Sequence, residues 1–197
     1  YWHVPQSIAD NEYLPELRRD PFYLLNQNIR ILSGGREINP ILVDWSAMGN
    51  RFPYAMRQEP GAGNALGRIK FMFPNRHSVY MHDTPTRSLF QRSVRSFSHG
   101  CIRLQDPMAM AGFVFGGQLT VERVEEMIAS GRTRDIILDR TIPVHIAYFT
   151  ARVDENGVVN FFNDLYRRDQ ALIQAMDDSA PEPPTQIADN VEHRGLN

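Results

Sequence analysis

Ser98-His99-Gly100-Cys101-Ile102-Arg103 holds the only cysteine among the 197 residues of the chain. A lone cysteine excludes an internal disulfide and any metal cluster built from several cysteines. The residues around it are polar and include glycine, so they lack the periodicity of an element that faces a core. His82 lies upstream, at the end of a predicted strand. We therefore expect Cys101 to be a reactive thiol.

A cysteine and a histidine together can carry out acyl transfer. The thiolate is the nucleophile, and a free cysteine with a pKa of about 8.5 is mostly protonated at neutral pH. An imidazole can remove that proton and later return it to a leaving amine, and both His82 and His99 are candidates. Gly100 permits a sharp turn, and backbone N–H groups at such a turn can hold a developing oxyanion.

The charge around this cysteine differs from that of the whole chain. Residues 82–103 contain four arginines and one aspartate, a net charge of +3, whereas the chain as a whole carries −2. A cationic stretch lowers the pKa of a thiol and attracts a substrate that bears a carboxylate. The near balance of charge over the chain argues against a nucleic-acid or polybasic membrane binder.

Two other interpretations of Cys101 stay open at this stage. The thiol could fill a core while the arginines form a solvated face. Alternatively, His82, His99 and Cys101 could bind zinc together with a further ligand. The sequence contains no phosphate-binding glycine loop and no serine nucleophile elbow. Its longest apolar stretch, residues 108–119, is shorter than the roughly 18 residues of a membrane-spanning helix.

The rest of the chain predicts a mainly β or α+β protein with helical insertions, in which residues 6–60 are a less regular appendage. Helical pieces are expected within residues 5–30, one of them beginning at Asp20-Pro21, and further helices are expected after Asp106-Pro107, after Thr120 and over Arg168–Met176. Strands are expected within 29–44, at 68–73, 78–82, 135–138, 143–153 and 158–162, with a loop over 46–67 and a turn at Asn156-Gly157.

His82, a spacer of fifteen residues and Ser98-His99-Gly100-Cys101 resemble the signature of L,D-transpeptidases with a YkuD-type catalytic domain. Further segments resemble the YcbB-like branch of that family in particular: residues 64–71, 82–85 and 142–145, followed by Tyr166 and Asp169. The resemblance covers about residues 1–172. It implies a β-sandwich-like catalytic domain, here without the N-terminal strands that family members carry before the segment matching Tyr1–Pro5.

The resemblance also implies a domain organisation. Residues 1–5 and 61–172 would form the catalytic domain, incomplete at its N-terminus, and residues 6–60 a capping or lid subdomain. Residues 173–197, acidic and rich in proline, would form a flexible tail.

By the same resemblance, Cys101 would attack a donor stem tetrapeptide of peptidoglycan, release D-Ala and form a thioester that an acceptor amine resolves into a 3→3 cross-link. His82 would be the general base, oriented by the backbone carbonyl of Asp83, and backbone N–H groups of Gly100 and Cys101 would hold the oxyanion. The donor site would be lined by Ser98, His99, Arg103 and Arg95. Arg103 stands where the family motif often has asparagine. No metal and no cofactor is expected, and carbapenems typically acylate the cysteine of this family.

Two related functions share this site. An L,D-carboxypeptidase would hydrolyse the same thioester, and a catalytically defective form would only bind peptidoglycan. Donor and acceptor stem peptides are the expected partners, and nucleic acid is not. The substrate implies a periplasmic or envelope location and a role in cell shape, although this chain shows no signal peptide. Membrane anchoring or fusion to a peptidoglycan-binding module in the full-length protein stays open.

Overall fold

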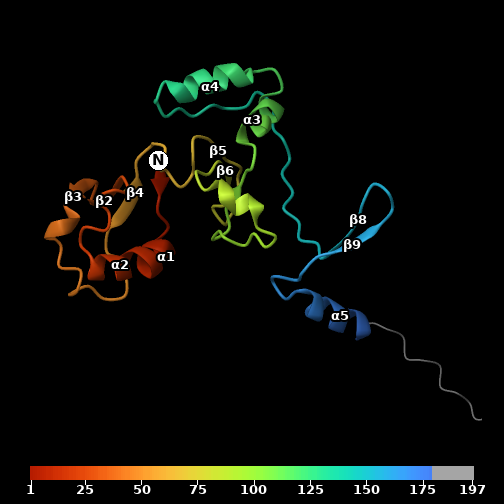
Figure 1. Ribbon diagram of the computed structural model, residues 1–197, viewed down its shortest axis with the longest axis horizontal. Coiled ribbons are helices and arrows are strands. Elements are labelled where there is room, and N and C mark those ends of the chain that lie inside the picture. The colour runs from red at the N-terminus through yellow and green to blue at the C-terminus, as the bar shows by residue number, and fades with distance from the viewer. Residues whose placement is uncertain (179–197) are drawn as a thin grey trace, which may run out of the picture. The chain divides into compact units, whose positions relative to one another are not determined.

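The computed structural model describes residues 1–178, which belong to two compact units divided after Val144. Figure 1 shows the elements of both units. The first unit contains two sheets and most of the helices. The second contains one hairpin and one helix. The predicted β-rich chain with inserted helices is confirmed, since three sheets of four, three and two strands carry the fold.

The N-terminal sheet has the strand order β1-β4-β2-β3. All neighbouring strands are antiparallel, and β2 and β3, both within the stretch 29–44 where strands were predicted, form a hairpin across Gly34-Gly35. The strands are β1 (Trp2–His3), β2 (Ile29–Ser33), β3 (Arg36–Ile38) and β4 (Ala55–Gln58). Because β1 pairs with β4, residues 1–5 share a sheet with the segment predicted as a cap, and not with the segment 61–172.

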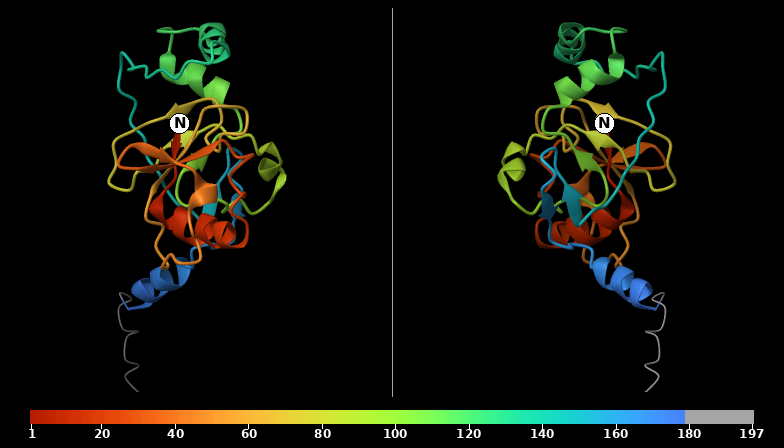
Figure 2. Two further views of the ribbon diagram at one scale, coloured as in Figure 1. Left: turned by 90° about the vertical axis from the view of Figure 1, so that its left-hand side faces the viewer. Right: turned by 90° about the vertical axis from the view of Figure 1, so that its right-hand side faces the viewer.

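One core joins this sheet to the helices of the same segment, and the helices within residues 6–19 lie together on one side of the sheet in Figures 1 and 2. Leu14 and Leu17 from the helices and Ile31 from β2 are almost fully buried there. Phe52 stacks on Trp45 with ring centroids 5.5 Å apart. The helices are α1 (Gln6–Ile8), the π-helical η1 (Ala9–Tyr13), α2 (Leu14–Arg19) and the 3₁₀ turn η2 (Pro40–Leu42). The segment 6–60, expected to be irregular, thus has its own ordered core.

The second sheet of this unit has the order β5-β6-β7. A helical pair follows it, and its apolar side chains cluster with Ile69 and Phe71 around β5. The elements are β5 (Lys70–Phe71), β6 (Met81–His82), the 3₁₀ helix η3 (Arg87–Gln91), β7 (Ile102–Arg103), α3 (Pro107–Phe115) and α4 (Val121–Ala129). Both helices begin where predicted, since Asp106 accepts a hydrogen bond from the Ala109 amide and Thr120 from that of Arg123.

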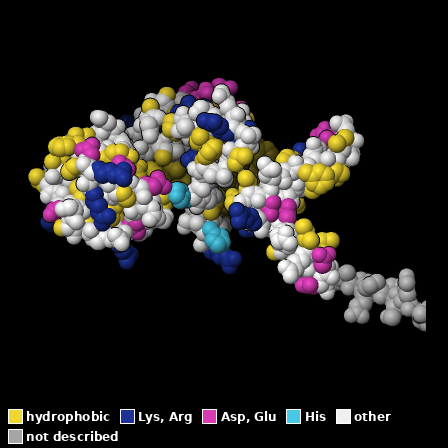
Figure 3. Space-filling view, turned by 60° about the horizontal axis from the view of Figure 1, so that its bottom comes forward, with side chains coloured by type: hydrophobic (Ala, Val, Ile, Leu, Met, Phe, Trp, Pro, Cys, Tyr) yellow, Lys and Arg dark blue, Asp and Glu magenta, His cyan; other side chains and the backbone are white. Residues whose placement is uncertain are grey.

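The second unit consists of the hairpin of β8 (Ala151–Val153) and β9 (Val159–Phe161), followed by α5 (Asp169–Asp177). The predicted turn at Asn156-Gly157 joins the two strands. Apolar side chains gather on the surface of this hairpin, as Figure 3 shows; Phe161 is 80% exposed. No helix within residues 1–178 is long and apolar enough to cross a membrane.

Several predicted elements are absent or shifted. Asp20-Pro21 opens a series of turns and no helix; the Asp20 carboxylate accepts from the amide of Phe22, and the Asp20 carbonyl accepts from the amide of Tyr23, three residues along. No strand forms over 135–138 or 143–150. The predicted loop 46–67 contains β4. Residues 173–177 are helical rather than part of a flexible tail, and the remainder of the predicted tail, 179–197, lies outside the described residues.

Candidate active site

The pairing of β6 with β7 brings the predicted base and nucleophile to one face of a sheet. The two strands are parallel, with Met81 opposite Ile102 and His82 opposite Arg103. A backbone hydrogen bond of 3.0 Å from Ile102 to Tyr80 extends the ladder. Since side chains alternate between faces, Tyr80 and His82 share a face with Cys101 and Arg103.

Cys101 is partly exposed and contacts Tyr80. Burial, the nearby Cys101 thiol and a hydrogen bond to that thiol together raise the pKa of Tyr80 to about 12. The Tyr80 ring also lies 5.9 Å from the imidazole of His82, edge to face. Tyr80 therefore contacts both predicted catalytic groups.

The loop before Cys101 is held by its own residues. Ser98 Oγ donates to the carbonyl of Cys101 at 2.6 Å and accepts from the amide of Gly100 at 3.3 Å. Gly100 has a φ of +128°, a backbone conformation that side chains other than hydrogen rarely tolerate. Ser98 thus shapes the turn that presents the thiol, and it occupies one of the two N–H groups predicted for the oxyanion.

His82 is buried, and its Nδ1 lies 2.5 Å from the backbone carbonyl of Asp83. A carbonyl only accepts, so Nδ1 carries the proton and Nε2 is left as a proton acceptor. Burial lowers the pKa of His82, the cation of Arg103 lowers it further, and the Asp83 carbonyl opposes both. The imidazole is accordingly neutral near pH 7, the form that a general base requires.

The two arginines predicted to line the donor site differ in placement. Arg103 donates from Nη1 to the carbonyl of Phe97 at 3.0 Å. Its Nε is buried without a hydrogen-bond partner, the one such side-chain atom among residues 1–178. Arg95 is exposed, and its Nε donates to the carbonyl of Arg92. This hydrogen bond lies within the loop that carries Arg95.

His99 points toward the N-terminal helices. Its Nε2 lies 3.3 Å from a carboxylate oxygen of Glu12 in η1, and both side chains are more than half exposed. Within the part of the chain that the structure describes, no three His, Cys, Asp or Glu side chains are grouped to hold a metal ion. The zinc alternative through His82, His99 and Cys101 therefore has no support in the geometry.

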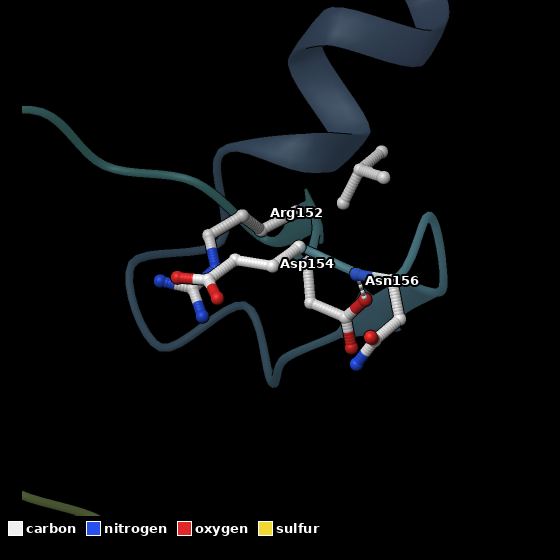
Figure 4. Close-up of a pocket in the computed structure, with 5 residues that line it drawn as sticks. Arg152, Asp154 and Asn156 are labelled. Atoms are coloured by element: carbon white, nitrogen blue, oxygen red, sulfur yellow. Dashed lines mark hydrogen bonds between the residues drawn. The ribbon is translucent and has the colours of Figure 1, made fainter.

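Two hollows lie away from these residues. One, of about 380 Å³, is formed by the β8–β9 turn and lined by residues 152–156. Figure 4 shows the amide of Asn156 bonded to Asp154, whose carboxylate also accepts from the amide of Val158. The other, of about 360 Å³, is lined by residues 26–28, 58 and 61–64. Neither is lined by His82 or Cys101, and the first is the shape of an ordinary turn.

Tyr80 is the site residue that the sequence analysis missed. A signal for it exists, because it stands two positions before His82 in a predicted strand and so must share its face. Its partner is not visible from spacing, since only the parallel register with β7 places Tyr80 beside Cys101.

Comparison with known proteins gives the family of this chain. The family model of the L,D-transpeptidase catalytic domain, YkuD, matches residues 1–126. A Haemophilus influenzae protein named "Putative L,D-transpeptidase" is 33% identical over 173 residues, which cover 87% of this chain. The chain spans about a third of that relative's length, 35%. Since the family match includes more than half of the chain together with the β6–β7 ladder, this chain belongs to the L,D-transpeptidase catalytic domain (YkuD) family.

Proposed function

We propose that the chain is the catalytic part of a cysteine L,D-transpeptidase that forms 3→3 cross-links between peptidoglycan stem peptides in the cell envelope. The single observation that carries the proposal is the β6–β7 register, which gives Cys101 and His82 one common face. The family acts on cell-wall peptidoglycan, and the YkuD match supports the substrate class.

The proposed first half-reaction makes a thioester. Nε2 of His82 takes the thiol proton of Cys101, and the sulfur attacks the carbonyl carbon of the third residue of a donor tetrapeptide. The C–N bond to the fourth residue breaks, and His82 returns the proton to the amine of the departing D-Ala. The cation of Arg103, which shares the face of Cys101, would attract the carboxylate of that D-Ala.

The second half-reaction forms the cross-link. An acceptor side-chain amine attacks the thioester carbonyl, the C–S bond breaks, and the amine proton passes through His82 back to the thiolate. One amide bond is exchanged for another, so no energy source is required. Backbone N–H groups of Gly100 and Cys101 would stabilise the oxyanion of both steps once Ser98 Oγ gives up its bond to Gly100.

We further propose that the segment 6–60 acts as a lid over this site. Its own core lets it move as a body, and its link to the catalytic sheet includes hydrogen bonds between Gln58 and residues 63–65. The contact of Glu12 with His99, at 3.3 Å, joins the lid to the loop that carries Cys101. Substrate capture would then require this contact to open.

A disaccharide tetrapeptide distinguishes cross-linking from hydrolysis. Incubated with the protein, it should yield a dimer that has lost one D-Ala, detected by mass spectrometry. Cys101→Ala should form neither dimer nor a covalent adduct. Tripeptide without dimer would assign a carboxypeptidase, and binding without either product would assign a binding module.

A further inference from the structure

We propose that Arg68 and Arg87 are positioning residues of the active site: they clamp the carboxylate of Asp83 and thereby hold its backbone carbonyl against Nδ1 of His82. The inference rests on the proposed function, because it explains how the base is kept in its working orientation. Neither arginine contacts the imidazole, and both act through Asp83.

The Asp83 carboxylate is surrounded by donors. Oδ1 accepts from Arg87 Nη2 at 2.7 Å and from the amide of Thr84 at 2.8 Å. Oδ2 accepts from the backbone amide of Arg68 at 2.9 Å and from its Nε at 3.4 Å. Both oxygens are therefore fixed by groups from different segments of the chain.

Burial makes these contacts matter. The Asp83 side chain is only 4% exposed, whereas the side chains of Arg68 and Arg87 are about half exposed. A buried charge is unfavourable unless it is paired and hydrogen-bonded, and removing one partner leaves it uncompensated. The carboxylate is thus expected to follow its arginines if they move, and to turn toward solvent if they are lost.

The arginines also connect the two sides of the catalytic ladder. Besides Asp83, Arg87 donates from Nη1 to the carbonyl of Gln105, just beyond β7. The Asp83 amide donates to the carbonyl of Ile69, and the amide of Leu104 donates to that of His82. Asp83 is consequently held at its amide by Ile69, just before β5, and at its carboxylate by Arg68 and Arg87, while Leu104, just after β7, binds the preceding carbonyl.

A shift of Asp83 would reach the base directly, because the amide of Thr84, in the same peptide as the Asp83 carbonyl, donates to the carboxylate. The carbonyl of Asp83 is the partner that keeps the proton on Nδ1 and leaves Nε2 free to accept one. If the carbonyl turns away, the ring can rotate or change tautomer. A misplacement of about 1 Å can slow an enzyme roughly 100-fold.

The test uses the full chain and two readouts. The first is the downfield Nδ1–H proton resonance of His82, assigned by its loss in His82→Gln. The second is the rate of Cys101 alkylation by iodoacetamide at neutral pH, followed by intact mass; the single cysteine gives one adduct. Arg87→Gln, Arg68→Gln and the double variant are compared with Arg92→Gln, which removes the same charge from the same cationic stretch. Circular dichroism verifies folding.

We expect Arg87→Gln to shift or broaden the His82 resonance and to slow alkylation about 10-fold, the double variant to slow it further, and Arg87→Lys to recover part of the rate. Arg92→Gln should change neither readout by more than about 2-fold. If Arg87→Gln does not fold, Arg68→Gln carries the test, because its side chain contributes only the 3.4 Å contact.

An unchanged resonance in the double variant, or an equal loss of rate in Arg92→Gln, would overturn the clamp. Failure of the proposed function would appear differently. The wild-type chain would then make no cross-linked dimer, while the resonance of His82 would still depend on the two arginines.

Discussion

Replacing Gly67 with alanine should weaken the fold at a point that also supports the active site. Gly67 has a φ of +61°, and a Cβ built there would lie 2.5 Å from Cγ and Oδ2 of Asp83. Two separate penalties follow. The left-handed backbone costs a residue with a Cβ about 1–2 kcal/mol. Pushing the buried carboxylate off the Arg68 amide adds about 1–3 kcal/mol, the penalty for leaving a buried polar group unsatisfied.

The sum, about 2–5 kcal/mol, can be separated into its parts by a matched glycine. Gly131 has a φ of +68° and nothing within 4 Å of the position its Cβ would occupy. Gly131→Ala should therefore lose only the backbone part. The difference between the two variants, about 1–3 kcal/mol, measures the contact with Asp83.

Urea denaturation followed by circular dichroism measures both variants. The midpoint should fall further for Gly67→Ala, and the slope with denaturant should stay unchanged, so that the comparison reports stability alone. Equal losses in the two variants would refute the reasoning. They would mean that Asp83 moves aside freely and that its carboxylate is not fixed.

Three further outcomes are expected. Burial and Arg103 lower the pKa of His82 below its usual 6.5, and only the neutral imidazole accepts a proton. The rate of Cys101 acylation should therefore fall on the acidic side with a midpoint below pH 6.5. A pH series with the midpoint at or above 6.5 would contradict this. Glu12→Gln removes the carboxylate from an exposed contact with His99 and should change stability by less than about 1 kcal/mol. It should alter KM for the donor peptide if the lid is held through this contact, and an unchanged KM argues against that role. Phe52→Ala should cost about 3–5 kcal/mol in urea denaturation, since its ring is fully buried against Trp45, and a loss under 1 kcal/mol would show that the N-terminal core repacks easily.

The sequence predicted an element correctly where the hydrogen bonds that stabilise the element join residues close together in the chain. The helix starts at Asp106 and Thr120 are examples, because each cap bonds to an amide three residues along. The β8–β9 turn is another, since Asp154 bonds within its own turn. The Cys101 motif belongs here too, because a six-residue stretch and one upstream histidine identified the family.

The sequence did not predict an element or a contact where its formation depends on residues far away in the chain. Residues 135–138 and 143–150 have strand-like composition, but a strand requires a neighbour, and none pairs with them within the described residues. β4 was hidden among glycine and proline residues, yet it is the strand that pairs with both β1 and β2. The environment of Asp83 could not be foreseen either, since Arg68 and Arg87 reach it from opposite sides in the sequence.

The parallel arrangement of β6 and β7 has a consequence for how the proposed pair of His82 and Cys101 tolerates insertions and deletions. Parallel neighbours cannot be joined by a tight turn, so a long connection between His82 and Cys101 is obligatory. Once β6 and β7 pair, the distance between the imidazole and the sulfur is set by the hydrogen bonds between the two strands. It does not depend on the length of the segment that connects them. Doubling such an excursion raises its closure entropy by only about 0.6 kcal/mol. Insertions between residues 92 and 96 should therefore leave the reacting atoms in place, so this stretch can be altered to suit different substrates while the chemistry is retained.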